Sequence, residues 1–161
     1  WDATFVAAGD VDGDGRVDVV LAPSESAGGS YRIAWFEAPA DPEQPWTEHA
    51  IDPAVESVHH FVGVADLDGD RDLDVAAAEM HQGADPDEVK VYWNDGAGAA
   101  WTKQVLSATG SHSMRLADFD GDGDVDLAGA NWSGAHQPVE LWVNGAAIFV
   151  DGFETGDTSR W

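Results

Sequence analysis

The stretch LADFDGDGDVDLAGA, residues 116–130, determines how this sequence is interpreted. It places five aspartates at alternate positions, from Asp118 to Asp126, between two apolar runs. Short apolar runs bounded by glycine and aspartate are typical of β-strands. Like charges at this spacing repel one another. The arrangement is therefore favourable only where a cation binds among the carboxylates or where the turn is fully solvated.

The same pattern occurs three times along the chain. Residues 7–22 read AAGDVDGDGRVDVVLA, residues 63–78 read GVADLDGDRDLDVAAA, and residues 115–130 read RLADFDGDGDVDLAGA. The first aspartates of the three copies, Asp10, Asp66 and Asp118, lie 56 and 52 residues apart. An internal repeat of about 50 residues is the signature of a repeat architecture.

Each repeat reads as four short strands. In the second copy these are residues 60–66, 73–79, 89–94 and 101–107, and the third of them alternates apolar and polar residues. Clusters of Gly, Ser, Pro and Asp separate the second strand from the third, and they predict loops at residues 23–30, 80–88 and 131–138. No convincing amphipathic helix is present. Four strands in a repeat of this length are typical of a β-propeller blade.

An apolar strand, the turn D-x-D-G-D-x-x-x-D, a second apolar strand and a third strand with tryptophan together resemble the FG-GAP/VCBS repeat family over residues 5–153. That family forms calcium-binding blades in integrin-α-like propellers and in many secreted bacterial proteins. The resemblance implies an all-β fold of three four-stranded propeller-type blades, with a calcium-binding loop between the first and second strands of each. It is unspecific for activity, because such blades occur in adhesins, lectin-like modules and enzyme appendages.

The expected organisation is one domain, residues 1–153, of three repeats at about residues 5–60, 61–112 and 113–153, followed by a tail at residues 154–161. Propellers usually close with four to eight blades, so three blades form an open or incomplete propeller. Either the chain is a piece of a longer propeller, or separate copies complete the stack. Head-to-tail contacts between copies would give a ring or a filament. The tail is expected to pack on the body or on a neighbouring copy.

The residue types in the turns suit calcium, which takes six to eight oxygen ligands in flexible geometry. Positions one, three, five and nine of each turn supply carboxylates, and position seven supplies a backbone carbonyl. The predicted ligands, about one Ca²⁺ per repeat, are Asp10, Asp12, Asp14, Arg16 and Asp18; Asp66, Asp68, Asp70, Asp72 and Asp74; and Asp118, Asp120, Asp122, Asp124 and Asp126. Position six is Gly15 or Gly123 in the outer copies but Arg71 in the middle one, so Arg71 must accept the sharp turn.

Other interpretations of the turns fit less well. An EF-hand needs a glutamate at position twelve, where this chain has Leu21, Ala77 and Gly129. A strand rather than a helix follows each turn. Magnesium favours fewer protein ligands and more water. Solvated acidic turns without metal remain an alternative.

Composition excludes several classes of partner. The chain has 161 residues, 43% of them hydrophobic, and a net charge of −24, so it is expected to fold but not to bind nucleic acid. Of its 31 acidic residues, 14 lie in the three turns. It contains no cysteine and no apolar run long enough for a membrane span. The first repeat begins near residue 5 without a signal peptide, as expected of a mature or excised product.

The remaining candidate residues favour structural roles. His60 and His112 share a repeat position, which favours a repeated structural role such as hydrogen bonding between blades. Tryptophans of the third strands are expected in the core. No catalytic constellation can be assembled, because nothing in the sequence brings two glutamates together as a glycosidase pair. Asn131 opens the sequon NWS and is a candidate for N-glycosylation in a loop.

These observations predict an extracellular, secreted bacterial protein of the cell surface or of a fibre. It is expected to be a calcium-stabilised structural or adhesive repeat protein, not an enzyme, whose partners are copies of itself. The alternative is a module that binds a glycan or a cell-surface protein and is cut from a larger propeller. A third reading is an accessory domain of a polysaccharide-active enzyme.

Overall fold

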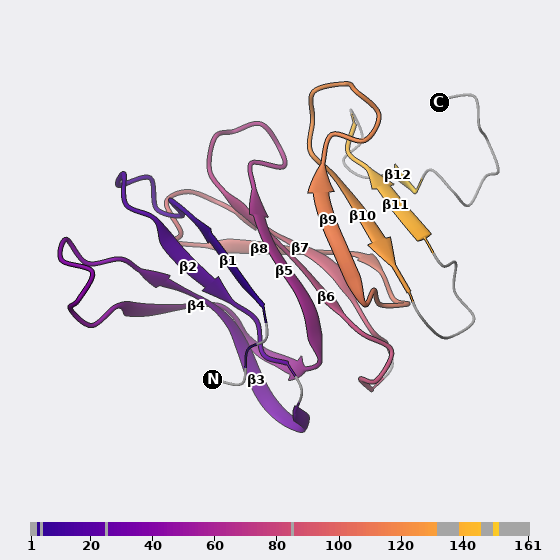
Figure 1. Ribbon diagram of the computed structural model, residues 1–161, viewed down its shortest axis with the longest axis horizontal. Coiled ribbons are helices and arrows are strands. Elements are labelled where there is room, and N and C mark those ends of the chain that lie inside the picture. The colour runs from indigo at the N-terminus through magenta and orange to yellow at the C-terminus, as the bar shows by residue number, and fades with distance from the viewer. Residues whose placement is uncertain are drawn as a thin grey trace.

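The computed structural model describes residues 3, 5–24, 26–84, 86–131, 139–145 and 150–151. These residues contain no helix and form three antiparallel sheets, none of which closes on itself (Figure 1). Each sheet follows the order of its strands in the chain. The strands are β1 (Val6–Gly9), β2 (Asp18–Leu21), β3 (Ser26–Glu37) and β4 (Thr47–Ser57) in sheet 1; β5 (His59–Ala65), β6 (Asp74–Glu79), β7 (Val89–Asn94) and β8 (Trp101–Ser107) in sheet 2; and β9 (Ser113–Ala117), β10 (Asp126–Ala130), β11 (Val139–Val143) and β12 (Val150–Asp151) in sheet 3.

The all-β architecture of consecutive four-stranded sheets fits a propeller-like arrangement, as the sequence predicts. The first and second strands of each sheet pair directly on either side of the acidic turn: Gly9 pairs with Asp18, Ala65 with Asp74 and Ala117 with Asp126. Each acidic turn therefore closes the hairpin between the first and second strands of its sheet. The repeat boundaries and the tail stay predictions, and the tail, residues 154–161, lies outside the described residues.

The prediction of a loop at residues 23–30 is wrong in part. Strand β3 begins at Ser26, which pairs with Ser57, the last residue of the long strand β4. Strand β4 continues to pair with β3 on the N-terminal side of Ile33. Shifts in register between Ser26 and Ala34, typical of β-bulges, allow this pairing to extend through the glycine-rich segment. The described residues of the loop predicted at residues 80–88, all but residue 85, belong to no strand, and Asp87 forms an isolated bridge with Thr109. Most of the loop predicted at residues 131–138 lies outside the described residues.

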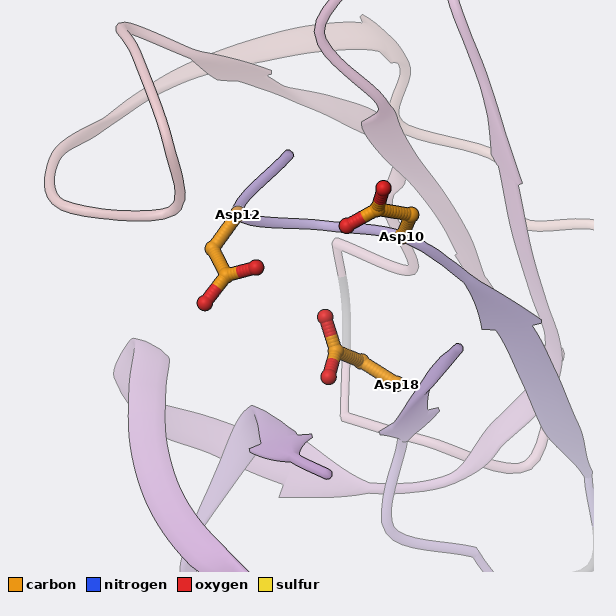
Figure 2. Close-up of side chains that lie close together, drawn as sticks. All are labelled: Asp10, Asp12 and Asp18. Carbon is orange, nitrogen blue, oxygen red and sulfur yellow. The ribbon is translucent and has the colours of Figure 1, made fainter. Parts of the chain in front are cut away.

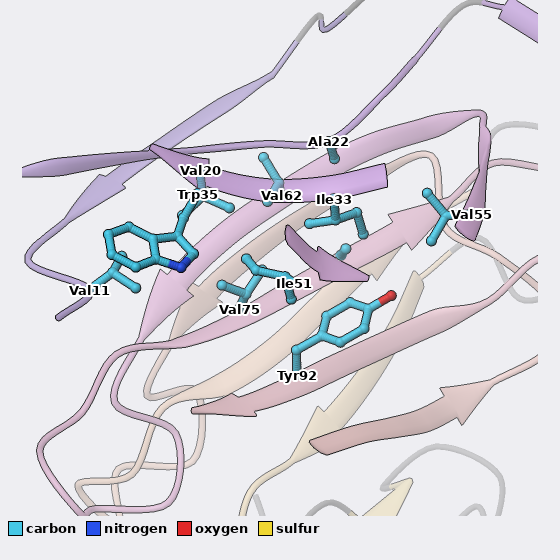
Figure 3. Close-up of a cluster of buried hydrophobic side chains, with 11 residues drawn as sticks. Val11, Val20, Ala22, Ile33, Trp35, Ile51, Val55, Val62, Val75 and Tyr92 are labelled. Atoms are coloured by element: carbon cyan, nitrogen blue, oxygen red, sulfur yellow. The ribbon is translucent and has the colours of Figure 1, made fainter. Parts of the chain in front are cut away.

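Two hydrophobic cores lie between the sheets. The core between sheets 1 and 2 contains Ile33 and Trp35 from β3, Val75 from β6 and Tyr92 from β7 (Figure 3). The core between sheets 2 and 3 contains members of the same two strands of sheet 2, such as Ala76 and Val91, together with residues of sheet 3. Successive residues of a strand point to opposite faces, so sheet 2 contributes to both cores. For this reason all residues of β6 are buried.

The tryptophans of the third strands lie in or against the two cores, and two histidines meet between sheets. Trp35 and Trp142 are buried in the two cores, as expected, and Trp93 packs partly buried against the second. The ring of His60, on β5, lies edge-on to that of His112, before β9, with 4.7 Å between the centroids. Residues of this shared position thus meet across neighbouring sheets through ring contact.

Candidate metal centre

The three acidic turns comprise residues 10–18 (turn 1), 66–74 (turn 2) and 118–126 (turn 3). They protrude from the same side of the molecule, where the first strand of each sheet ends (Figure 1). Positions one to nine are counted from the first aspartate of each turn, Asp10, Asp66 or Asp118. Because the strands leading into and out of each turn are paired, the turn positions are fixed relative to the sheets.

A common set of hydrogen bonds shapes the turns. The carboxylate at position one accepts the backbone N–H of position six: Asp10 from Gly15 at 2.9 Å, Asp66 from Arg71 at 3.1 Å. The third turn repeats this contact between Asp118 and Gly123 at 3.0 Å. Carboxylates at positions three and five each accept the N–H two residues further on. These side chains therefore fold back over the turn.

Folding back brings carboxylate oxygens together within 4.8 Å of one another in all three turns. In turn 1, Asp10, Asp12 and Asp18 form such a group, which Figure 2 shows converging on a common space. Positions one, three and five converge in the other two, as Asp66, Asp68 and Asp70 and as Asp118, Asp120 and Asp122. In turn 1, Asp14 joins Asp12 and Glu37 instead.

The aspartate at position nine has a structural task in every turn. Asp74 is buried, and its two carboxylate oxygens accept the N–H groups of Leu67 at 2.8 Å and Asn94 at 2.9 Å. Asp18 and Asp126 are buried in the same way and accept the equivalent N–H groups of their own repeats. Position nine thus ties each turn to the end of the third strand of its sheet.

Position seven was predicted to contribute only a backbone carbonyl, and at Arg16 the side chain turns to other partners. Its Nε donates to the carbonyl of Ala38, and its guanidinium forms an ion pair with Asp14 and a longer one with Glu37. The Arg16 side chain therefore adds positive charge beside the position-five carboxylate of turn 1.

Position six requires a left-handed backbone. Gly15 has φ 90° and Gly123 has φ 100°, and Arg71 adopts φ 84° in the middle turn. The expectation that Arg71 accepts the sharp turn is confirmed. Only glycine takes such values without a steric cost, so turn 2 carries local strain that the other two avoid.

Crowding and partial burial raise the pKa of the position-three aspartate in each turn. The pKa of Asp12 and that of Asp68 are raised, first by partial removal from water and then by the negative charge of neighbouring aspartates. The pKa of Asp120, at the same position of turn 3, is raised for the same reasons. Burial raises the pKa of Asp74 to about 6, although two backbone N–H groups oppose the shift. A bound cation would reverse this tendency.

Two groups of residues near the turns were missed by sequence reasoning. Asn94 ends the third strand of repeat two, Asn144 follows that of repeat three, and both contact the turns. The Asn that repeats two and three share close behind a tryptophan was a signal that could have identified them. Glu37 approaches turn 1 because β3 pairs with β2, for which the sequence offers no local signal.

Asn131, the candidate for glycosylation, follows β10. It is half-buried, and its Nδ2 donates to Glu140 Oε2 at 3.2 Å. Its modification stays a prediction, and the rest of the sequon lies outside the described residues.

A model of the FG-GAP-like repeat matches the chain twice, at residues 10–77 and 66–129. Each match starts at position one of one turn and runs through the next turn into the strand that follows it. Together the matches cover well over half of the chain. No curated protein and no solved structure matches it. The described residues form no helix with the length and hydropathy that a bilayer crossing requires. FG-GAP-like repeats are typical of non-enzymatic modules of the adhesive type, and this chain belongs to the FG-GAP-like repeat family.

Proposed function

We propose that this chain is an extracellular, calcium-stabilised structural or adhesive module that associates with copies of itself. The observation that carries the proposal is the convergence of carboxylates in all three turns. Negative charges held this close destabilise the fold unless a cation lies among them. Carboxylates converge once in every repeat, although position nine takes the place of position five in the turn 1 group, and this recurrence indicates a common purpose.

The donors fit calcium. Every converging side chain offers hard carboxylate oxygens and none offers sulfur or nitrogen, which favours Ca²⁺ over zinc or copper. In turn 1, Asp10 Oδ1 is buried and accepts no hydrogen bond from any described residue. A buried acceptor without a donor is costly, and a cation would compensate it.

The ligands proposed for each Ca²⁺ are the carboxylates of positions one, three and five and the carbonyl of position seven. Position nine contributes through lone pairs that its two backbone hydrogen bonds leave available. The cation supplies the positive charge that offsets the carboxylates. The chain's own residues fix its place: position nine anchors the turn to the third strand, and the paired strands hold its two ends.

The end sheets support association between copies. Beside sheet 1, Val17 of turn 1 is 61% exposed and Val6 of β1 is 63% exposed, and beside sheet 3, Phe119 of turn 3 is 40% exposed. The equivalent residues inside the chain are covered: Leu73 approaches Gly9 of the preceding sheet, and Leu67 is 3% exposed. A second copy that docks sheet 1 on sheet 3 would cover these side chains as the internal contacts do. Such a contact is head-to-tail and gives a ring or a filament.

One observation favours the alternative of a ligand-binding module. A cavity of about 240 Å³ lies between β4 and sheet 2, and Glu56, Glu79 and Lys90 are among its lining residues. Its charged groups pair with one another, since buried Lys90 Nζ lies 2.6 Å from Glu79 Oε1, and Lys103 Nζ lies 2.5 Å from Glu88 Oε2. A small polar molecule would have to replace these contacts, so we prefer the structural role.

Thermal melting with calcium and with excess chelator tests the metal. Each site adds about 1.4 kcal/mol at ten times its dissociation constant, so three sites add roughly 4 kcal/mol. The melting temperature should fall by about 10 °C in chelator. A triple variant Asp12→Asn, Asp68→Asn and Asp120→Asn should melt alike in both conditions. Identical melting of the unmodified protein in calcium and in chelator contradicts the proposal.

Light scattering in calcium tests association. The unmodified protein should give species larger than one chain, and Val17→Asp and Phe119→Asp should each reduce them. Val105→Asp is the matched control, because Val105 is 45% exposed on β8, away from both end faces. A single-chain mass at every concentration contradicts self-association, and binding of a glycan by that monomer would favour the alternative.

A further inference from the structure

Two asparagine side chains reach from one repeat into the acidic turn of the preceding repeat. Asn94, at the end of β7, is 3% exposed. Its Nδ2 donates to the carbonyl of Val11 in turn 1 at 3.0 Å and to that of Leu73 in turn 2 at 3.3 Å. One amide group thus joins the backbones of two turns that lie more than 50 residues apart in the chain.

Asn144 makes the same contacts one repeat later. It follows β11 and is buried, and its Nδ2 donates to the carbonyl of Leu67 in turn 2 and to that of Val125 in turn 3. The contact atoms occupy positions two and eight of the turns in both cases. Because the contact recurs at equivalent positions in two separate interfaces, it is a regular part of the repeat structure.

Each asparagine also holds the position-nine aspartate of its own turn. The backbone N–H of Asn94 donates to Asp74 Oδ1 at 2.9 Å, and that of Asn144 donates to Asp126 Oδ1 at 2.7 Å. Asn94 Oδ1 accepts N–H groups from Gly96 and Gly98, which fixes the orientation of the amide. The Asn94 side chain therefore cannot move independently of turn 2 or of turn 1.

The first repeat lacks this device. Ala38 stands in the equivalent place, and its N–H donates to Asp18 Oδ1 at 2.8 Å. An alanine side chain has no amide with which to reach another turn. The contact therefore always runs from a later repeat to the turn before it: Asn94 of repeat two donates to turn 1, and Asn144 of repeat three donates to turn 2.

We propose that Asn94 and Asn144 are positioning residues that couple cation binding in neighbouring turns. The inference rests on the proposed function, because it requires that the turns bind calcium. A cation that orders one turn fixes the carbonyl to which the asparagine donates, and the asparagine in turn fixes the next turn. The second cation then orders less of the chain and binds more tightly, which is positive cooperativity. Asn94 couples turns 1 and 2, and Asn144 couples turns 2 and 3.

Calcium titrations of variants with one turn disabled measure this coupling. Amide resonances of Gly13, Gly69 and Gly121 report the occupancy of turns 1, 2 and 3 separately, because each glycine occupies position four of its own turn. Asp68→Asn disables turn 2, and the calcium affinity of turn 1 is compared with and without it. We expect the affinity of turn 1 to fall about fivefold when turn 2 is disabled, at the lower end of typical coupling between sites.

The same comparison in an Asn94→Ala background should show less than a twofold effect. Asn144→Ala is the matched control: it should leave the coupling of turns 1 and 2 intact and remove that of turns 2 and 3. A merely structural asparagine would lower the melting temperature of the protein but leave the ratio of affinities unchanged. If Asn94→Ala does not fold, Asn94→Ser is measured, since a serine hydroxyl is too short to reach Val11.

The outcomes separate the two proposals. Absence of calcium binding in the unmodified protein overturns the metal sites and the coupling together. Calcium binding with the same fivefold effect in the Asn94 variant overturns the coupling alone. Loss of the effect in Asn94→Ala and its retention in Asn144→Ala support the coupling as stated.

Discussion

The middle and the last repeat place the same turn in different surroundings. At position two, Leu67 is 3% exposed because sheet 3 covers it, whereas Phe119 is 40% exposed. Val11, at this position of the first repeat, is 1% exposed because sheet 2 covers it. The difference lies in the neighbouring sheet and not in the turn, since the hydrogen bonds at positions one, three, five and nine recur in all three copies.

This comparison shows where stability resides. The turns supply local geometry, and the contact between sheets supplies the apolar burial that stabilises them. The middle repeat, packed on both faces, is also the repeat that tolerates a strained Arg71. Local strain persists where surrounding packing over-determines the conformation.

The largest expected effect compares truncation at position two of the middle and last repeats. Leu67→Ala removes a buried side chain from the core between sheets 2 and 3 and should reduce the free energy of unfolding by about 3 kcal/mol. Phe119→Ala should cost less than about 1 kcal/mol in a single chain, because much of its side chain is in water. Chemical denaturation in saturating calcium at low protein concentration measures both. Equal losses would mean that the turn itself, and not the neighbouring sheet, determines the contribution of position two.

A smaller effect concerns the pH dependence of the middle sheet. His59, at the start of β5, is buried, and burial together with the charge of Lys90 lowers its pKa to about 3. Below its ordinary pKa near 6.5 the unfolded chain takes up a proton that the folded chain does not. Stability should therefore fall as the pH falls, by about 2 kcal/mol between pH 7 and pH 5.

The control for this prediction is His59→Asn, which does not titrate. Its free energy of unfolding should depend less steeply on pH over the same interval, whatever its value at pH 7. Effects of pH on the carboxylates of the turns are common to both proteins and cancel in the comparison. Parallel pH profiles of the two proteins would show that the pKa of His59 is the same in the folded and the unfolded chain, which contradicts the prediction.

Much of the fold followed from sequence because its signals are local. Alternation and the spacing of the aspartates predicted four strands per repeat and placed each turn between the first and second strands, and the strand positions agree. The extension of β3 back to Ser26 was missed, since it depends on pairing with β4 across a bulged hairpin. Glycine and serine carry no periodic signal that could reveal such pairing.

The turn residues were predictable for the same reason, and their distant partners were not. Asp66, Asp68 and Asp70 lie close in the chain, so their spacing brings their carboxylates together, and the same positions converge in turn 3. Asn94 lies 83 residues from Val11, and its contact exists only because sheet 2 packs on sheet 1. Likewise, nothing local indicates that the position-nine carboxylate also accepts a backbone N–H from the end of the third strand, as Asp74 does from Asn94.

The smallest expected effect exchanges glycine and arginine at position six. Arg71→Gly relieves the cost of φ 84° and should stabilise the protein by about 1 kcal/mol, after the greater flexibility of glycine in the unfolded chain is subtracted. Gly123→Arg should destabilise it by a similar amount. A Cβ at Gly123 meets no other atom within 4 Å, so backbone strain and not a steric clash causes this loss of stability. Denaturant midpoints in excess calcium report both changes. If Arg71→Gly lowers the midpoint instead, the Arg71 side chain makes a stabilising contact that outweighs its backbone strain, and the middle turn is supported by its own residue and not by the sheets on either side.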